Sequence, residues 1–272
     1  MDMPELPEVE TSCRGIRPHL VGKSIDHIEV LNGQLRWPVS EEIHSLRQAQ
    51  VHSVSRRSKY ILIETGDGHM IIHLGMSGSL RVIDADEPLK KHDHLIFHLP
   101  DGKQMRYHDP RRFGCALWTH ESPARHTLIR SLGPEPLSEA FTPEHLIQSC
   151  EGRQRTIKQH IMDGHVVVGV GNIYACEALH FSKINPKKPA AKVSKPKLRL
   201  LHQNIRKVLS NAIEQGGTTL RDFTKSDGQP GYFQQELYVY GREAEPCKVC
   251  DGTIKRVVLG QRSTFYCPRC QP

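Results

Sequence analysis

The sequence predicts an α+β protein of several domains: a β-rich N-terminal half, a helical segment and a short C-terminal ribbon held by metal. A chain of 272 residues is long enough for two or three folded units. From about residue 23 to 119, short runs of β-branched and aromatic residues alternate with turn formers. Near residue 132 the apolar spacing becomes helical, and the chain ends with two C-x2-C pairs.

Composition narrows the class of partner without deciding it. The chain carries a net charge of +7 and has a pI of about 9.0, which suits a polyanion such as nucleic acid. Many basic proteins bind no nucleic acid, so charge alone leaves this open. The sequence has no apolar run of about 18 residues and no signal-peptide pattern near its start, so we expect a cytoplasmic protein without membrane spans.

The N-terminus places a proline close to a methionine start. Met3 directly precedes Pro4 and Glu5. A proline at a chain terminus is a secondary amine, which can condense with an aldehyde-like carbon to give an iminium, and the next carboxylate lies within reach of that carbon. Met1 and Asp2 would lock the Pro4 nitrogen into an amide. We therefore expect translation to begin at Met3, whose removal exposes Pro4.

The segment after Pro7 has the apolar spacing of a helix. Proline suits the first helical turn, and Pro18 marks the predicted end of the helix. The buried stripe is predicted to consist of Val9, Cys13, Ile16 and Leu20.

The β-rich half consists of short runs separated by turns. Two turn sequences, 66–68 and 100–102, lie between strand-like runs, and the second predicts a hairpin. A sandwich and a barrel both satisfy this pattern. The runs are Ile25–Leu31, Tyr60–Ile63, Met70–Leu74, His94–Leu99 and Cys115–Trp118.

Helices follow from about residue 132. Thr142 and Pro143 form an N-cap followed by proline at the first helical position. A longer apolar stripe across 194–212 ends at Gly216 and Gly217, as a helix C-terminus does. That stripe comprises Leu198, Leu201, Ile205, Val208 and Ala212.

A glycine turn lies between these helices. Gly169-Val170-Gly171-Asn172 follows an apolar run and opens a helix that Asn172 is expected to cap. A helix N-terminus reached by flexible backbone favours a phosphate. A tight turn before a capped helix is the alternative. The spacing matches neither the dinucleotide nor the P-loop fingerprint, which argues against a nucleotide cofactor.

The four C-terminal cysteines predict a structural zinc site. Cys247, Cys250, Cys267 and Cys270 form C-x2-C-x16-C-x2-C, which can place four thiolates around one Zn²⁺ and leave no position for water or substrate. A redox pair and an iron–sulfur site are the alternatives. Arg262 would lie near the tip of the ribbon, where it could contact a phosphate. The remaining cysteines, Cys13, Cys115, Cys150 and Cys176, are expected to be buried thiols.

Two glycine-bearing turns, 73–76 and 109–113, combine polar and bulky residues. Met76 and Phe113 suit a hydrophobic core, but with Arg111 they would also suit the gap left in a base stack by a flipped nucleotide. Lys59 and the basic segment 91–94 are expected at the surface, where solvated charge is the alternative to DNA contact.

In their joint order, these segments closely resemble the formamidopyrimidine-DNA glycosylase family, bacterial enzymes that excise oxidised purines from DNA. The resemblance covers essentially the whole chain. Its markers are PELPEVE at 4–10, RRSKY at 56–60, HLGMSGSLR at 73–81, KHDH at 91–94, DPRRFG at 109–114, LGPEPL at 132–137, VVGVGNIYA at 167–175, EQGGTTLRDF at 214–223, SDGQPGYF at 226–233 and QRSTFYC at 261–267.

The resemblance implies an architecture and a partner. We expect a catalytic β-sandwich with flanking helices over 1–134, a helix–two-turn–helix domain over 135–225, a lesion-facing loop and linker over 226–237, and a zinc ribbon over 238–272. Damaged double-stranded DNA would lie in a cleft between the domains. The resemblance also implies a monomer with one structural Zn²⁺ that works in the bacterial cytoplasm and is associated with the nucleoid when bound to DNA.

The family's site residues carry over to matching positions. Pro4 would attack the sugar C1′ with Glu5 as acid and base, while Lys59 and Arg262 would serve the elimination steps. The implied DNA contacts are His73, His92, Arg111, Arg153 and Asn172. The residues implied to fill the void are Met76, Arg111 and Phe113, and those implied to face the lesion are Glu8, Ser226 and Tyr232.

Two other functions compete with this one. An endonuclease VIII-type glycosylase would excise oxidised pyrimidines, although Leu6 and the 226–233 loop favour the purine enzyme. A DNA-binding protein without catalysis would result if Met1 and Asp2 stay in place. The chain also departs from the family pattern at Cys176, Gly164-His165 and Gln159-His160.

Overall fold

The computed structural model describes residues 4–216 and 236–272. These residues divide into two compact units, and each unit is described by itself. The first contains the described residues up to Ser131, and the second is formed by Leu132–Glu214 with the C-terminal residues from 236 onward.

The first unit begins with helix α1, Leu6–Leu20. Pro7 lies in its first turn, and the predicted stripe from Val9 to Leu20 is buried against strand β2, Arg47–Arg57, and its neighbours. The expected end at Pro18 is wrong, because the helix continues through Leu20. Pro18 lies on the exposed side of the last turn, and burial of Leu20 completes the apolar stripe beyond it.

Eight strands and two short helical segments complete the first unit. All strand pairs are antiparallel, in the order β5-β7-β6-β1-β2-β3-β4-β8. Their bounds are β1 Ser24–Val30, β2 Arg47–Arg57, β3 Tyr60–Thr65, β4 Gly68–His73, β5 Ser79–Asp84, β6 Asp93–Leu99, β7 Lys103–His108 and β8 Cys115–Thr119, with helix α2 at Glu41–Ser45 and a 3-10 turn at Pro123–Arg125.

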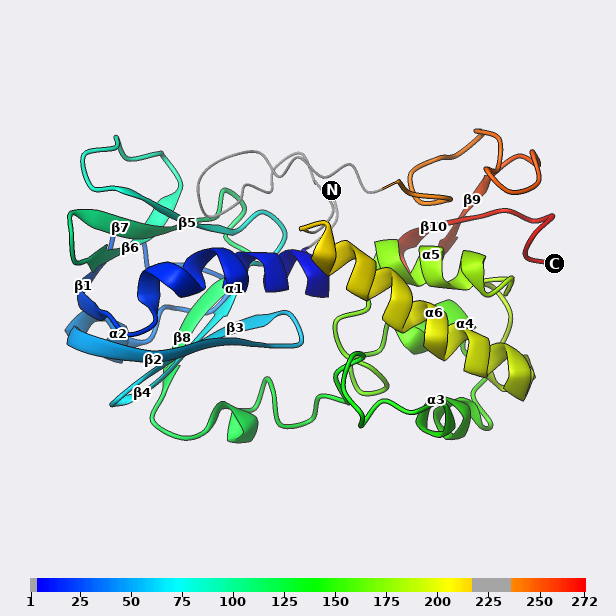
Figure 1. The fold of residues 1–272 in the computed structure, drawn as a ribbon, viewed down its shortest axis with the longest axis horizontal. Coiled ribbons are helices and arrows are strands. Elements are labelled where there is room, and N and C mark those ends of the chain that lie inside the picture. The colour runs from blue at the N-terminus through cyan, green and yellow to red at the C-terminus, as the bar shows by residue number, and fades with distance from the viewer. Residues whose placement is uncertain (1–3, 217–235) are drawn as a thin grey trace. The chain divides into compact units, whose positions relative to one another are not determined.

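The strands form two facing layers, as the sequence predicts for a β-sandwich. Figure 1 shows β5, β6 and β7 above, β2, β3 and β4 below, and α1 alongside them. One hydrophobic core takes its side chains from α1 and both layers, among them Ile16, Ile61, Met70 and Phe97. The predicted hairpin is confirmed, since Leu99 pairs with Lys103 across the 100–102 turn.

The β-rich unit also buries a cluster of charges. The carboxylate of Asp93 on β6 lies 2.7 Å from Arg81, 3.6 Å from Arg106 and 2.9 Å from His108 Nδ1. Its second oxygen accepts the backbone N–H of Lys90 at 3.0 Å. A buried carboxylate is tolerated where charged and hydrogen-bonding partners surround it in this way.

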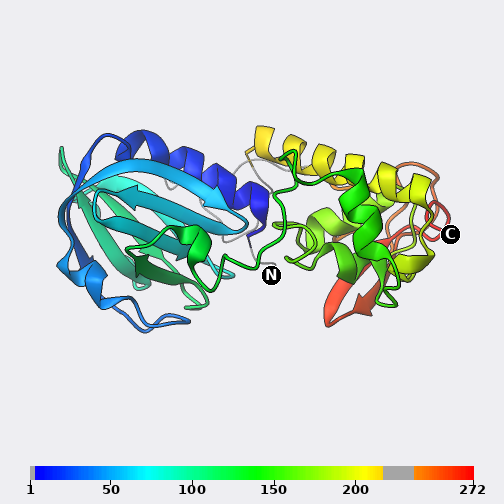
Figure 2. The same cartoon turned by 90° about the horizontal axis from the view of Figure 1, so that it is seen from below.

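The second unit is helical with a small ribbon attached. Its helices are α3 Pro143–Cys150, α4 Ile157–Ile161, α5 Asn172–Phe181 and α6 Lys195–Glu214, with a 3-10 turn at Ala190–Lys192. The predicted start of α3 is confirmed, because the Thr142 hydroxyl accepts the backbone N–H of His145 at 3.0 Å. The apolar stripe of α6 packs against α3 and α5 (Figure 2).

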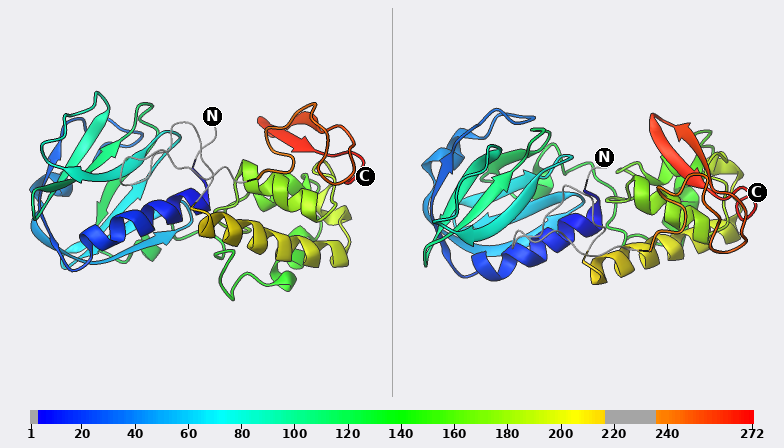
Figure 3. Two further views of the ribbon diagram at one scale, coloured as in Figure 1. Left: turned by 45° about the horizontal axis from the view of Figure 1, so that its top comes forward. Right: turned by 90° about the horizontal axis from the view of Figure 1, so that it is seen from above.

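The ribbon consists of β9, Lys255–Leu259, and β10, Arg262–Tyr266. Leu259 pairs with Arg262, and the two residues between them, Gly260 and Gln261, both have positive φ angles of 54° and 61°. This is the backbone of a tight hairpin turn of the I′ kind. The ribbon packs beside α5, as the two views of Figure 3 show.

Among the described helices, none is long and apolar enough to cross a bilayer.

The Asp93 cluster should make the stability of the first unit depend on acid. Burial alone would raise the pKa of Asp93, but the hydrogen bonds from His108 and Lys90 and the charge of Arg81 outweigh it and hold the pKa at about 2, below the ordinary 3.8. A depressed folded-state pKa stabilises the native protein above pH 3.8, and the stabilisation disappears as the pH falls towards 2. It amounts to roughly 2 kcal/mol.

We therefore expect Asp93→Asn to lower the free energy of unfolding at pH 7 and to differ less from the parent protein near pH 3. Denaturant unfolding at several pH values measures this, with the exposed Asp86→Asn as a matched control. An Asp93→Asn deficit that does not change with pH would contradict the assignment.

Candidate functional site

The described chain opens at Pro4, which is buried beside the N-terminus of α1. Glu5, only 2% exposed, is the N-cap residue of that helix. Its backbone N–H donates to the Glu8 carboxylate at 2.9 Å, and its own side chain accepts the N–H of Glu8 in return. The Pro4-Glu5 pair is thereby fixed at the positive end of a helix. Glu8 is fully buried, and its carboxylate accepts the backbone N–H of Glu5.

Lys59 lies in the tight turn between β2 and β3 and is half-buried. The adjacent Tyr60 pairs with His73 at the end of β4, with ring centroids 5.0 Å apart. Burial and the nearby Lys59 and Arg36 charges lower the pKa of His73 to about 4. The ring is therefore neutral at pH 7. Because Nδ1 accepts the Gly75 N–H at 2.9 Å, Nε2 carries the proton and is a donor.

Asp109 holds together the two glycine-bearing turns. Its carboxylate is fully buried and accepts from the Ser77 hydroxyl at 2.7 Å, the Gly114 N–H at 2.9 Å and the Tyr107 hydroxyl at 3.3 Å. Ser77 in turn accepts the N–H of Arg111 at 3.1 Å. The turn after β4 and the turn after β7, far apart in sequence, are thus held side by side.

The contact between these turns requires glycine at position 75. Gly75 has a φ of +64°, and a Cβ at this position would lie 2.5 Å from the backbone of Phe113 and Gly114. The two turns carry the three residues expected to fill the void, Met76, Arg111 and Phe113. Arg111 is exposed, its guanidinium stacks 4.9 Å from the Phe113 ring, and Phe113 is 45% exposed. Met76 is half-buried.

The segment that carries His92 is held by the backbone of the same residue, Asp109. The His92 carbonyl accepts the N–H of Asp109 at 3.0 Å, and His94 Nε2 lies 2.8 Å from the Asp109 carbonyl. His92 is half-buried, and its ring lies edge-on to His108 with the ring centroids 6.0 Å apart. Within the first unit, the structure therefore places His92 on a segment that is fixed to the segment of Arg111 and Phe113.

Asn172 is placed differently from its predicted role as a helix cap. Gly171 is the N-cap residue of α5, and Asn172 is the first helical residue. Its side-chain oxygen accepts from the ammonium of Lys158, and its nitrogen donates to the Ser263 carbonyl at 3.0 Å. Lys158, 1% exposed, also donates to the Thr264 hydroxyl at 2.7 Å. These two side chains fasten β10 to the helices, and the capping prediction is wrong.

Arg262 is exposed at the start of β10, directly after the hairpin turn, as predicted. The turn itself rests on α4, because a Cβ on Gly260 would lie 2.7 Å from the side chain of Gln159. Arg153 is exposed in the loop before α4, near the polar hollow that His145 and His165 also line. Both arginines therefore belong to the second unit and point to solvent.

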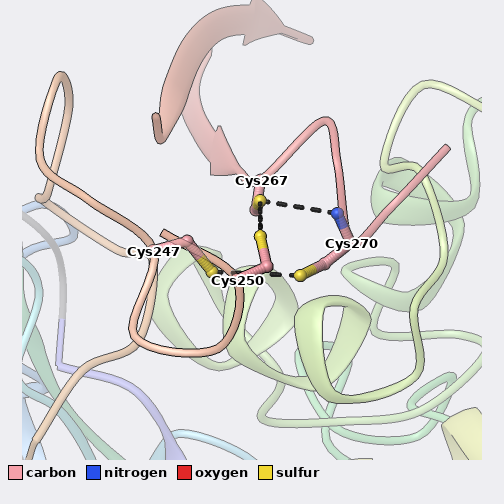
Figure 4. A group of neighbouring side chains, drawn as sticks. All are labelled: Cys247, Cys250, Cys267 and Cys270. Atoms are coloured by element: carbon pink, nitrogen blue, oxygen red, sulfur yellow. Dashed lines mark hydrogen bonds between the residues drawn. The ribbon is translucent and has the colours of Figure 1, made fainter. Parts of the chain in front are cut away.

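The four cysteines form a tetrahedral sulfur site (Figure 4). All four sulfurs lie within 4.8 Å of one another, with 3.9 Å between Cys247 and Cys270 and 3.5 Å between Cys250 and Cys267. A Zn–S bond of about 2.3 Å requires tetrahedral sulfurs about 3.8 Å apart. The site fits Zn²⁺, and its four ligands leave no open coordination position.

A buried carboxylate anchors the chain that leads into this metal site. Glu177 on α5 accepts the backbone N–H groups of Tyr238, Val239 and Tyr240 at 2.9–3.0 Å. Burial nevertheless raises its pKa above the usual value. Few apolar residues are buried around the ribbon, so apolar packing alone contributes little to its stability, and we expect the ribbon to depend on its metal.

Three sequence models match the chain in succession. They are the formamidopyrimidine-DNA glycosylase N-terminal domain over residues 3–116, the H2TH domain of the same enzyme over 132–224, and the zinc finger found in FPG and IleRS over 244–272. The chain belongs to the formamidopyrimidine-DNA glycosylase family. It is therefore a DNA glycosylase of base excision repair with a structural zinc finger.

Whole-chain comparisons agree. The formamidopyrimidine-DNA glycosylase of Cronobacter sakazakii is 55% identical over 269 residues, which cover 99% of this chain and 100% of the relative. A Lactococcus lactis enzyme in complex with abasic-site DNA matches with a TM-score of 0.90 and 34% identity, covering 98% and 99% of the two chains. A variant of the Lactococcus lactis enzyme in complex with Fapy-dG DNA matches with a TM-score of 0.91 and 33% identity, again covering 98% and 99% of the two chains.

Several residues at these sites were not predicted from the sequence. Asp109, Lys158 and Glu177 had no assigned role, although Asp109 lies within a recognised motif. The partners of Lys158 and Glu177 on the ribbon and on the segment before it are distant in sequence, and so is Ser77, the partner of Asp109 in the other turn. Only motif membership could have drawn attention to Asp109. Ser226 and Tyr232, expected to face the lesion, lie outside the described residues.

Asp109→Ala should loosen the loops that carry His92, Arg111 and Phe113. It leaves the buried Ser77 hydroxyl and the Gly114 N–H without their acceptor, while the Tyr107 hydroxyl keeps the His73 carbonyl at 3.2 Å. We expect this loss to lower the free energy of unfolding by about 2–4 kcal/mol. Denaturant unfolding and binding of an abasic-site duplex, measured where the variant is fully folded, would both show a loss. Asp84→Ala, which removes an exposed carboxylate paired with Lys103, is the control. Equal effects of the two substitutions would refute the central role of Asp109.

Removal of zinc should unfold the ribbon while the β-sandwich remains folded. A strong chelator is expected to release one zinc per chain, to weaken DNA binding and to leave the thermal transition of the first unit in place. A colorimetric zinc assay with circular dichroism measures this, and Cys250→Ser should act in the same way. Full DNA affinity after complete zinc release would contradict the role of the ribbon.

Proposed function

We propose that Pro4, once it is the terminal residue, attacks C1′ of a damaged nucleotide that has been everted from the DNA. The bond from nitrogen to C1′ forms as the base leaves with the electrons of the glycosidic bond, and the departing base takes up the proton that the amine loses. Glu5 protonates the sugar ring oxygen, the ring opens and an iminium results. The iminium makes the C2′ proton acidic, so the 3′ and then the 5′ phosphate can be eliminated.

The N-terminus of α1 supports this proposal. The positive end of a helix disfavours a nearby ammonium, which keeps a terminal proline amine in its neutral, nucleophilic form. The reciprocal hydrogen bonds between Glu5 and Glu8 set the direction of the Glu5 side chain before substrate arrives. Burial excludes water from around the pair, which is the observation on which the proposal mainly rests.

We propose further roles from the positions of the basic residues. Lys59 and the neutral His73 lie at the ends of adjacent strands and would contact phosphates beside the lesion, with Lys59 assisting β-elimination. His92, Arg111, Arg153 and Asn172 would hold the DNA backbone, and Arg262 on the ribbon would serve the second elimination. Met76, Arg111 and Phe113 would occupy the space that the everted base leaves.

The substrate we propose is duplex DNA that carries an oxidised purine, such as 8-oxoguanine or a formamidopyrimidine. The related Lactococcus lactis structures are complexes with abasic-site DNA and with Fapy-dG DNA. Ser226 and Tyr232 would face the lesion, and Glu8 would act beside it through Glu5. We propose that the enzyme works as a monomer in the bacterial cytoplasm, on nucleoid DNA.

Borohydride trapping tests the nucleophile. Reduction of a true iminium cross-links protein and DNA, so we expect a cross-link with protein that begins at Pro4 and none with protein that retains Met1 and Asp2. Glu5→Gln should slow base excision about 10²-fold or more, since it removes the general acid. The control Glu10→Gln, on the same helix, should stay within a few-fold. Cross-linking by the extended form would disprove the role of Pro4.

Single-turnover excision separates this enzyme from an endonuclease VIII-type glycosylase. We compare duplexes that contain 8-oxoguanine and thymine glycol under the same conditions, and the 8-oxoguanine duplex should react faster. The opposite order would overturn the purine assignment while leaving the iminium chemistry intact.

A further inference from the structure

The positive charge of the chain is concentrated in one segment of the second unit. Between Glu177 and Glu214 there are nine lysines and arginines and not one acidic residue. The whole chain has a net charge of +7, so all other residues together carry a net charge of −2. The basic character of the protein therefore comes from this segment and not from the loops around the proposed active site.

Five lysines of this segment form what we call the lysine patch: Lys183, Lys187, Lys188, Lys192 and Lys195. All five are exposed, and none forms an ion pair with a carboxylate in the described part of the chain. Nearby arginines differ, since Arg199 is paired with Glu144 and Arg155 with Asp163. The patch is thus an uncompensated positive surface.

The backbone beneath the lysine patch is well anchored. The Ile157 N–H donates to the Lys188 carbonyl at 2.7 Å, and the N–H groups of Ala190 and Ala191 donate to the 155 and 153 carbonyls at 3.0 Å. On the other side, the Lys197 ammonium donates to the Ser182 carbonyl at 3.1 Å. The patch therefore has a defined backbone that carries long, mobile ammonium groups, and it lies next to Arg153.

The lysine patch also adjoins the zinc ribbon. The Lys187 ammonium lies 5.2 Å from the centre of the Tyr266 ring, at the far end of β10 from Arg262. Four residues of extended strand span about 14 Å. Duplex DNA rises about 3.4 Å per base pair, so this length corresponds to about four base pairs. A ligand at the patch therefore lies well outside the contact that Arg262 makes.

We propose that the lysine patch is a second, sequence-independent binding surface for the phosphate backbone of undamaged duplex DNA. Lysine ammonium groups neutralise phosphates as point charges and read no base edge. Lysine is depleted from the cores of protein–protein interfaces, which disfavours a protein partner. The proposal rests on DNA being the substrate. It adds a contact that holds the enzyme on DNA away from the lesion.

The test compares two triple variants with the same change in net charge. Lys187→Gln, Lys188→Gln and Lys192→Gln remove the middle of the patch. Arg14→Gln, Lys103→Gln and Arg125→Gln remove exposed cations that are already paired with carboxylates. Each protein is titrated with undamaged and abasic-site duplexes of about 8 and about 40 base pairs over a range of salt, because each phosphate contact adds about 0.9 to the salt slope. The abasic site is at the centre of the short duplex, which therefore extends only about four base pairs to each side and ends before the middle of the patch.

We expect the patch variant to bind the long duplexes more weakly, with a salt slope lower by about 2 to 3, and to bind the short abasic-site duplex unchanged. The control variant should match the parent protein. Equal losses on short and long abasic-site duplexes would assign these lysines to the lesion site, and no loss on either would refute the surface.

Borohydride trapping on the short duplex keeps the two proposals distinct. If the patch variant still forms the cross-link, the Pro4 chemistry is intact, independently of what the patch binds. If acidic peptide or RNA competes for the parent protein and the patch variant loses that binding but keeps long-duplex affinity, the ligand is not DNA and the proposal fails.

Discussion

The buried carboxylate of Asp109 is the interaction on which the loops that carry His92, Arg111 and Phe113 depend. Irregular loops lack the regular hydrogen-bond ladder of a sheet, so their backbone must be fixed by other partners. Asp109 supplies acceptors to Ser77, Tyr107 and Gly114, and its own backbone bonds to the His92 segment. Three loops thus share one anion, and none of them can shift without disturbing the others.

The same arrangement recurs at three other irregular segments of the described chain. Glu8 fixes the residue before α1, Asp93 closes the turn that carries His92, and Glu177 holds the irregular segment that leads into the zinc site. Each carboxylate is buried and accepts backbone N–H groups, which makes the hydrogen bonds strong and their loss costly. The fold therefore positions its chemistry mainly through charged acceptors within the protein, and the metal performs the equivalent task for the ribbon.

Sequence patterns predicted the elements that depend on local spacing. The Thr142 cap and the 100–102 hairpin depend on a few neighbouring residues, and α6 and the cysteine quartet depend on a regular spacing within one short segment each. Asn172 was misjudged as a cap because its real partners, Lys158 and Ser263, include one 91 residues away. His160 likewise looked out of place, yet it is buried between Ser149 and Arg155. Such pairings become visible only after the chain has folded.

The distribution of charge separates two requirements of a repair enzyme. Discrimination of a lesion needs donors and wedges held in fixed positions, and this is the role we propose for Arg111 and Phe113, which the Asp109 loops hold in place. Retention on long DNA needs only positive charge, and a rigid, specific contact would slow movement between sites. The lysine patch, with an anchored backbone and unpaired ammonium groups, suits the second requirement. Because the two surfaces use different residues, affinity for undamaged DNA can change without altering the chemistry at Pro4.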